Sequence, residues 1–200
     1  MAGTADNFST TTIKAGTPGK LYANVAVPGA GARITLHTDG TPDSTANPNA
    51  VHLGMTKAGA TFTIKPAFTA YNADEFRSPI KSSLDAVEAT IEAELLQVED
   101  FDILEQLTQG FATLGSGSGY EQLQFGVKTI TYVPVALIWP TEADATKFAV
   151  VQLYKTINEA GLEAIQIARQ SQGACKVLFR GHDITSRSAA DVVGSFWKQV

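Results

Sequence analysis

The stretch of sequence that decides the fold is residues 84–98, which read Leu84-Asp85-Ala86-Val87-Glu88-Ala89-Thr90-Ile91-Glu92-Ala93-Glu94-Leu95-Leu96-Gln97-Val98. From residue 87 to residue 95 the odd positions are apolar and the even positions are polar. In a strand this alternation gives one apolar face and one line of carboxylates with no counter-cations. Ala, Glu and Leu also favour helix, and a helical stripe can be drawn through the same residues, so periodicity alone leaves both structures open: Val87, Ile91, Leu95 and Val98.

The rest of the chain has the pattern of a protein built from short strands. Residues 100–110 are the best helix candidate, because Asp100 can cap the first turn and Gly110 can end the last one. Alternating or apolar runs predict strands at 21–27, 33–38, 60–65, 127–139, 148–157, 162–169 and 174–180. We therefore expect a mainly β protein with one short α-helix.

The domain organisation is simple. Residues 1–20 are small and polar and predict an N-terminal arm with little core of its own. Residues 21–200 predict a single β domain, since 200 residues suffice for one core. Residues 39–50 are rich in Gly, Pro and Asn and predict a surface loop, and residues 115–119 predict a flexible linker.

Charge is unevenly distributed along the chain, whose formal net charge is −5. An acidic chain is a poor general nucleic-acid binder, which needs a basic surface. Residues 82–109 carry carboxylates but no Lys or Arg. Among the charged residues of 168–200, Lys and Arg outnumber Asp and Glu. These segments could be solvated faces of a monomer, or two sides of a self-association surface whose register is set by charge.

No constellation of residues predicts catalysis. His37, His52 and His182 are expected to be solvated or to lie at the edge of the core, and no His, Cys, Asp or Glu cluster has the spacing of a metal site. Cys175 lies in an apolar run and is expected to be a buried, inert thiol. We predict no catalytic residue, no metal and no cofactor. A carboxylate pair for glycoside chemistry is disfavoured, because the acidic stretch lacks aromatic sugar platforms.

Targeting segments are not evident either. The N-terminus lacks the charged start and apolar core of a signal peptide. No apolar run approaches the roughly 18 residues of a membrane span, so no membrane partner is expected.

Three segments carry a resemblance to a known family: residues 52–62, residues 72–80 with an acidic turn and Pro79, and the acidic alternating stretch to Leu96, followed at once by the short helix from Asp100. In this order the chain resembles the phage major tail tube protein family. Residues 134–140 and 175–183 look like late core strands of such subunits. On this resemblance we take residues 84–98 as a strand.

The resemblance implies a β-sandwich or barrel subunit with a flanking helix. Six copies would form a ring, with one sheet of each subunit joined to its neighbours, and rings would stack into a hollow tube. The implied partners are further copies of the chain, the tape measure protein and double-stranded DNA in the lumen, and tail terminator and tail tip proteins. The implied location is the virion tail, assembled in the host cytoplasm, and we favour a long non-contractile tail.

The candidate site residues of this tube follow from the acidic pattern and the loop. Glu88, Glu92 and Glu94 are predicted to face the lumen, the alternative being the outer surface. The loop 39–50 and the arm 1–20 are candidates for ring-to-ring contact and could order only on assembly. Other virion proteins, such as a tail terminator or a capsid decoration protein, and a ligand-binding β-sandwich or hydrolase remain alternatives. The loop residues chosen for inter-ring contact are Asp39, Asp43, Asn47 and Asn49.

Overall fold

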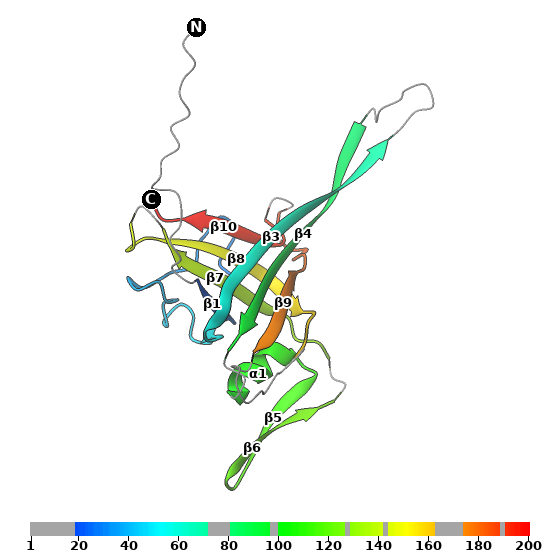
Figure 1. The fold of residues 1–200 in the computed structure, drawn as a ribbon. Helices are drawn as coiled ribbons and strands as arrows, with labels where there is room; N and C mark the ends of the chain where they lie inside the picture. Colours follow the sequence, from blue (N-terminus) through cyan, green and yellow to red (C-terminus); the bar gives the residue numbers. More distant parts are fainter. Residues whose placement is uncertain are drawn as a thin grey trace.

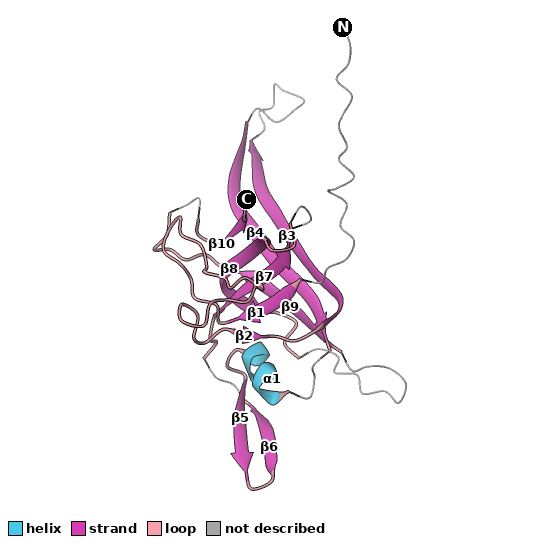
Figure 2. Cartoon of the chain, turned by 90° about the vertical axis from the view of Figure 1, so that its left-hand side faces the viewer, coloured by secondary structure: helices cyan, strands magenta, loops and turns pink. Residues whose placement is uncertain are grey.

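A computed structural model gives the fold of the chain (Figure 1), and it describes residues 19–71, 81–96, 100–126, 129–141, 144–162, 174–188 and 191–200. Strands predominate and one short helix accompanies them (Figure 2), so the predicted fold class is confirmed. The elements are β1 (Lys20–Ala23), β2 (Val51–His52), β3 (Thr56–Tyr71), β4 (Lys81–Leu95), α1 (Phe101–Thr108), β5 (Ala112–Gly117), β6 (Tyr120–Phe125), β7 (Val133–Pro140), β8 (Phe148–Asn158), β9 (Cys175–Gly181) and β10 (Gly194–Lys198).

Most strands belong to one antiparallel sheet in the order β2-β1-β7-β8-β9-β4-β3. β10 and β9 share one side of β8, with β10 beside residues 149–153 and β9 beside residues 156–158. The hairpin of β3 and β4 crosses in front of β7 and β8 (Figure 1), which gives a sandwich-like arrangement. The sheet does not close, so the barrel alternative is wrong.

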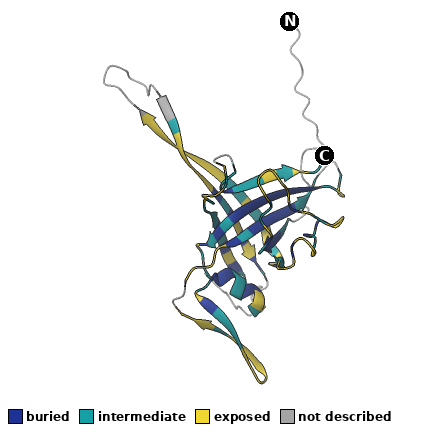
Figure 3. Cartoon of the chain, turned by 180° about the vertical axis from the view of Figure 1, so that it is seen from behind, coloured by how far each residue is buried: buried dark blue, intermediate teal, exposed yellow. Residues whose placement is uncertain are grey.

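The core lies where β4 and β9 face β7 and β8, with α1 against one end. Buried residues gather in this region, whereas both hairpins that leave the body are mostly exposed (Figure 3). A second cluster packs on the other face of β7 and β8, around Tyr22, Val25 and Phe148. The first cluster includes Leu21, Ile91, Leu107, Val135, Leu153 and Phe179, each at most 1% exposed.

Residues 81–95 form a strand, so the strand predicted for residues 84–98 is confirmed as far as Leu95, and residues 97–98 lie outside the described residues. Ile91 lies opposite Phe62 of β3 on one side and Phe179 of β9 on the other, and it is fully buried. Ala89, Ala93 and Leu95 are buried beside it. Pairing on both edges decides against the helical stripe, because the sheet buries every odd position from residue 89 to residue 95.

Helix α1 begins and ends close to the predicted positions. Asp100 accepts a hydrogen bond from the amide of Ile103 at 3.2 Å, as expected of an N-cap. Gln109 caps the other end with a left-handed backbone, and its buried side chain bonds to the backbone of Thr156 and Asn158 on β8. The helix is therefore tied to the sheet by hydrogen bonds as well as by apolar packing.

Several local predictions need correction. Residues 115–119 are not a linker, because they belong to the hairpin of β5 and β6, whose strands pair from Ala112↔Phe125 to Gly117↔Tyr120. The run 33–38 supplies one isolated bridge, Leu36↔Pro42, instead of a strand. β1 ends at Ala23, and β7 begins only at Val133. The turn at 72–75, most of the run 162–169 and arm residues 1–18 lie outside the described residues.

Candidate functional site

The acidic face of β4 continues onto its two neighbouring strands. On one side Lys65 of β3 lies opposite Glu88. On the other side Lys176 of β9 lies opposite Glu94. Directly opposed residues of an antiparallel pair share a face, so bases from both neighbours stand among the glutamates.

Each of the three glutamates predicted to face a lumen is paired with a base of its own chain. Glu88 lies 2.9 Å from Arg180, Glu92 lies 2.8 Å from Lys176, and Glu94 lies 3.2 Å from Lys57. The prediction of a carboxylate line without counter-cations is therefore wrong. It failed because the bases come from residues 57, 176 and 180, which are remote in sequence and adjacent only in the sheet.

Arg180 joins two glutamates. Its second guanidinium nitrogen lies 3.1 Å from Glu159, directly after β8, so this one side chain connects β4 and the end of β8. Lys176 and Arg180 belong to the basic C-terminal segment, and their charges are used within the chain. We call these pairs the ion-pair ladder, which consists of Lys57, Glu88, Glu92, Glu94, Glu159, Lys176 and Arg180.

The opposite face of the same hairpin is apolar and emerges from the core. The hairpin extends past the body (Figure 1), and its large apolar side chains from Ile64 and Val87 outward are partly or mostly exposed. Ile64 is 54% exposed, Phe68 63%, Leu84 56% and Val87 40%. Phe68 lies opposite Leu84, and Val87 lies opposite Pro66. We call Ile64, Phe68, Leu84 and Val87 the exposed apolar strip.

The strip adjoins a small apolar groove between the two sheet edges β3 and β10. Its volume is about 90 Å³, and its walls include Phe62 and Ile64 of β3, Val87 of β4 and Phe196 of β10. Phe196 is 61% exposed and stacks on Trp139 at 5.8 Å between ring centroids. The groove is too small for a drug-sized ligand, but it lengthens the apolar surface of the strip.

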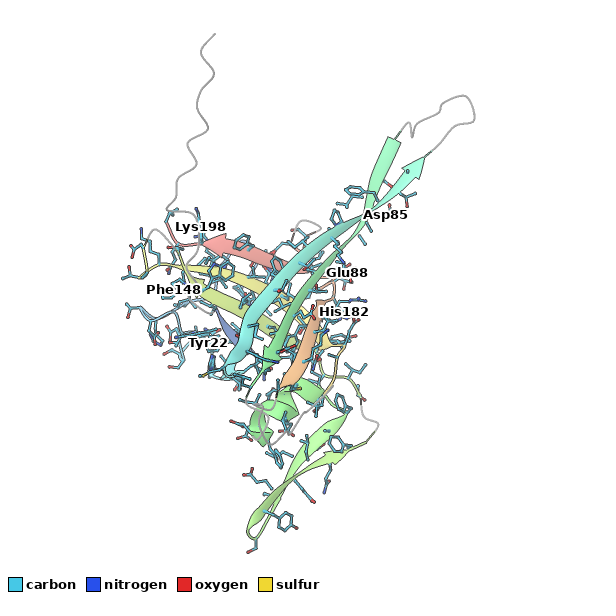
Figure 4. All side chains as sticks on the ribbon, in the orientation of Figure 1. Tyr22, Asp85, Glu88, Phe148, His182 and Lys198 are labelled. Atoms are coloured by element: carbon cyan, nitrogen blue, oxygen red, sulfur yellow. The ribbon has the colours of Figure 1, made fainter. Side chains whose placement is uncertain are left out.

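A bulge adjusts the register where the hairpin leaves the body, between Ala67 and Phe68 on β3. Asp85 lies at this point, beyond Glu88 on β4 (Figure 4). Its carboxylate accepts hydrogen bonds from the hydroxyls of Thr69 and Ser83. These bonds, the Thr69 bond first, lower the pKa of Asp85 from its ordinary value.

The four loop residues predicted for inter-ring contact have different surroundings. Asn47 is buried: it accepts from the amide of Ala26 at 3.0 Å and donates to the carbonyl of Asp43 at 3.1 Å. Asp39 and Asp43 accept from Thr41 and Thr45 respectively, within tight turns. Asn49 is exposed. Asn47 therefore holds the loop against the domain and offers nothing to a neighbouring subunit.

The three histidines and Cys175 do not come together in one site. His37 is half exposed and 3.9 Å from Asp43, His52 packs against Tyr22, and His182 packs edge-on against Tyr132. Burial raises the pKa of the Cys175 thiol, which is buried as predicted. Within the described residues, no group of three His, Cys, Asp or Glu side chains is placed to hold a metal ion.

A polar cavity of about 300 Å³ lies beside α1, and nothing in the sequence indicated it. Its walls include Glu105, Gln106, Gln109, Thr129 and Thr131. Two of its polar side chains have protein partners: Glu105 accepts from the amide of Leu114, and Gln106 accepts from Asn24. We therefore assign it no ligand.

Comparison with protein-family models and with curated protein sequences found no match for this chain. Among the described residues no helix has the length and apolarity needed to cross a bilayer.

Proposed function

We propose that this protein is a structural subunit that assembles with copies of itself, and that the assembly is the tail tube of a tailed phage. In this proposal six copies form a ring and rings stack into a hollow conduit. The tape measure protein and double-stranded DNA occupy the lumen, and terminator and tip proteins close the ends. The protein acts in the virion tail, without catalysis and without membrane contact.

The observation that carries the proposal is the exposed apolar strip. This sheet face packs in the core at one end, but at the other end its apolar side chains are exposed to water. A contiguous exposed apolar patch of this kind marks an interaction surface. Burying apolar surface yields about 25 cal/mol per Å², so covering four large side chains is a substantial driving force for association. The strip is continuous with the core face of β4, so a covering partner would extend the existing core.

The edge of the sheet supports self-assembly independently. β3 is 16 residues long and pairs only with β4 among the described strands. Its outer edge therefore presents unpaired backbone groups, a template for another strand. Pro66 is the feature of β3 that limits such pairing, because it has no amide proton. Pairing between different edges of successive copies is heterologous, and heterologous contacts close into rings when the rotation allows.

The resemblance supplies the specific identity of the assembly, and the two-faced hairpin fits it. One face would contact neighbouring subunits, while the ion-pair ladder on the other face stays hydrated and could line a conduit. A tail terminator or a capsid decoration protein could use the same surfaces, but such a protein stops at a single ring or trimer.

The test is negative-stain electron microscopy of the purified protein at rising concentration, with and without an extract containing phage tail initiators. Hollow tubes with a regular axial repeat are expected. Closed single rings would replace the tail-tube proposal with a terminator or decoration protein. Monomers under every condition would overturn self-assembly and favour a ligand-binding β-sandwich.

A further inference from the structure

The ion-pair ladder carries a second inference, which rests on the proposed function. We propose that Glu88, Glu92 and Glu94 act by neutralising the bases of their own sheet face, so that the face does not bind DNA as it passes. The carboxylates thus mask bases rather than form an acidic lining.

The first step is the charge count of the face. Among the described residues, the ladder and Lys65, which lies opposite Glu88, contain four acids and four bases, and Asp85, which accepts from Thr69 further along β4, adds one acid. The acids are Glu88, Glu92, Glu94 and Glu159, and the bases are Lys57, Lys65, Lys176 and Arg180.

The second step is accessibility. The side chains of Lys57, Lys176 and Arg180 are 58%, 46% and 41% exposed. A polyanion could therefore reach each base if its carboxylate were removed. Exposed pairs of this kind contribute only about 0–1 kcal/mol each to stability, so a role in folding does not account for the ladder.

The third step is the effect of an unbalanced face in a ring. Bases without partners would release counterions from DNA phosphates and hold the duplex. Acids without partners would repel the same acids on adjacent copies. A balanced face avoids both effects, and hydroxyl groups around the ladder, such as Thr61 and Thr63 of β3, keep it hydrated without adding charge.

The test measures binding of a short fluorescently labelled DNA duplex to the soluble subunit by anisotropy at low salt. The unmasked variant, in which the bases lose their carboxylate partners, combines Glu88→Gln, Glu92→Gln and Glu94→Gln. The matched control combines Asp102→Asn, Glu121→Gln and Asp183→Asn, which are exposed residues away from the ladder. Both triple variants change the net charge by the same amount. Circular dichroism establishes that each remains folded.

We expect wild type and control to bind DNA equally weakly and the unmasked variant to bind at least about tenfold more tightly. If three bases contact phosphates, its affinity should fall roughly 40-fold between about 50 and 200 mM salt. Further replacement of Lys57, Lys176 and Arg180 by Gln should abolish the gain. A folded unmasked variant that binds no better than the control, or a wild type that binds DNA tightly, would overturn the inference. Neither result depends on whether tubes form, so failure of the tail-tube proposal remains distinguishable.

Discussion

Phe68 of β3 lies directly opposite Leu84 of β4, and both side chains are more than half exposed. Cross-strand apolar pairs normally stabilise a sheet by packing beneath a second layer. Here the second layer ends before the pair is reached, because the hairpin extends past β7 and β8 (Figure 1). Because of the register shift between Ala67 and Phe68, Leu84 lies on the same face of the hairpin as Ile91. This face is buried in the core at Ile91 and exposed at Leu84.

Because burial changes along β4, truncating two apolar side chains of the same face to Ala should lower the free energy of unfolding by different amounts. Ile91→Ala should destabilise the subunit by about 2–5 kcal/mol, because it opens a cavity in a fully buried position. Val87→Ala, four residues earlier on the same face, should cost less than about 1 kcal/mol in the isolated subunit. Urea unfolding followed by tryptophan fluorescence measures both. Equal costs would show that the strip is covered within the monomer.

Substitution in the hydrogen-bond network that links α1 to β8 should also lower the free energy of unfolding. The side chain of Asn158 donates to the carbonyls of Leu107 and Gly161 and accepts from the amide of Leu178. Asn158→Ala would leave these buried backbone groups without partners, and we expect a loss of about 2–4 kcal/mol in unfolding free energy. Asn158→Asp keeps the acceptor but turns a buried carboxylate oxygen towards the carbonyls of Leu107 and Gly161, so at neutral pH it should lose at least as much. A near-neutral Asn158→Ala would contradict the network's importance.

Gly110 should be irreplaceable for two reasons. Its φ of +107° strains any side chain, and an added Cβ would collide with the carbonyl oxygen of Thr129. Gly110→Ala should therefore cost at least about 1–3 kcal/mol. Gly119 in the β5–β6 turn also has a positive φ, +84°, but open space around it, so Gly119→Asn should be tolerated. The thermal unfolding midpoints of the two variants separate the two effects: Gly110→Ala combines the steric clash with backbone strain, whereas Gly119→Asn has backbone strain alone.

Asp191 predicts a specific pH dependence. The Tyr154 hydroxyl donates to it at 2.7 Å, and Arg187 pairs with it, and these contacts lower its pKa in the folded state. A lowered folded pKa gives stability that is present above the unfolded value of about 3.9 and is lost as pH falls through the folded value. The stability difference between wild type and Asp191→Asn should therefore be constant above about pH 5 and shrink below about pH 4. A difference that grows on acidification would contradict this assignment.

Local sequence patterns predicted some features well and others poorly. The cap at Asp100 is a local signal that the structure confirmed, whereas the alternation in residues 84–98 left helix and strand open until the pairing of β4 with β3 and β9 showed a strand as far as Leu95. The balance of charge on β4 was not predictable, because Lys57, Lys176 and Arg180 reach it only through sheet pairing. Likewise, the glycines of residues 115–119 looked like a linker, whereas the register with β6 makes them a hairpin.

The exposed strip was also beyond local reasoning. Val87 and Leu95 have the same apolar character and the same place in the alternation. Leu95 is 1% exposed and Val87 is 40% exposed, a difference that depends on which elements lie over each position and not on the alternation. The burial of Asn47 was likewise not predictable from local sequence, because the loop 39–50 looked like a surface loop, yet Asn47 is buried.

The central claim, that the exposed apolar strip is an assembly surface, is tested most directly by sedimentation velocity on wild type, Phe68→Lys and Met55→Lys. Phe68 and Met55 are 63% and 64% exposed, so the two substitutions are matched, but Met55 lies outside the strip at the other end of β3. We expect wild type and Met55→Lys to form large species as concentration rises and Phe68→Lys to remain monomeric. Assembly of Phe68→Lys at wild-type concentrations would contradict the account.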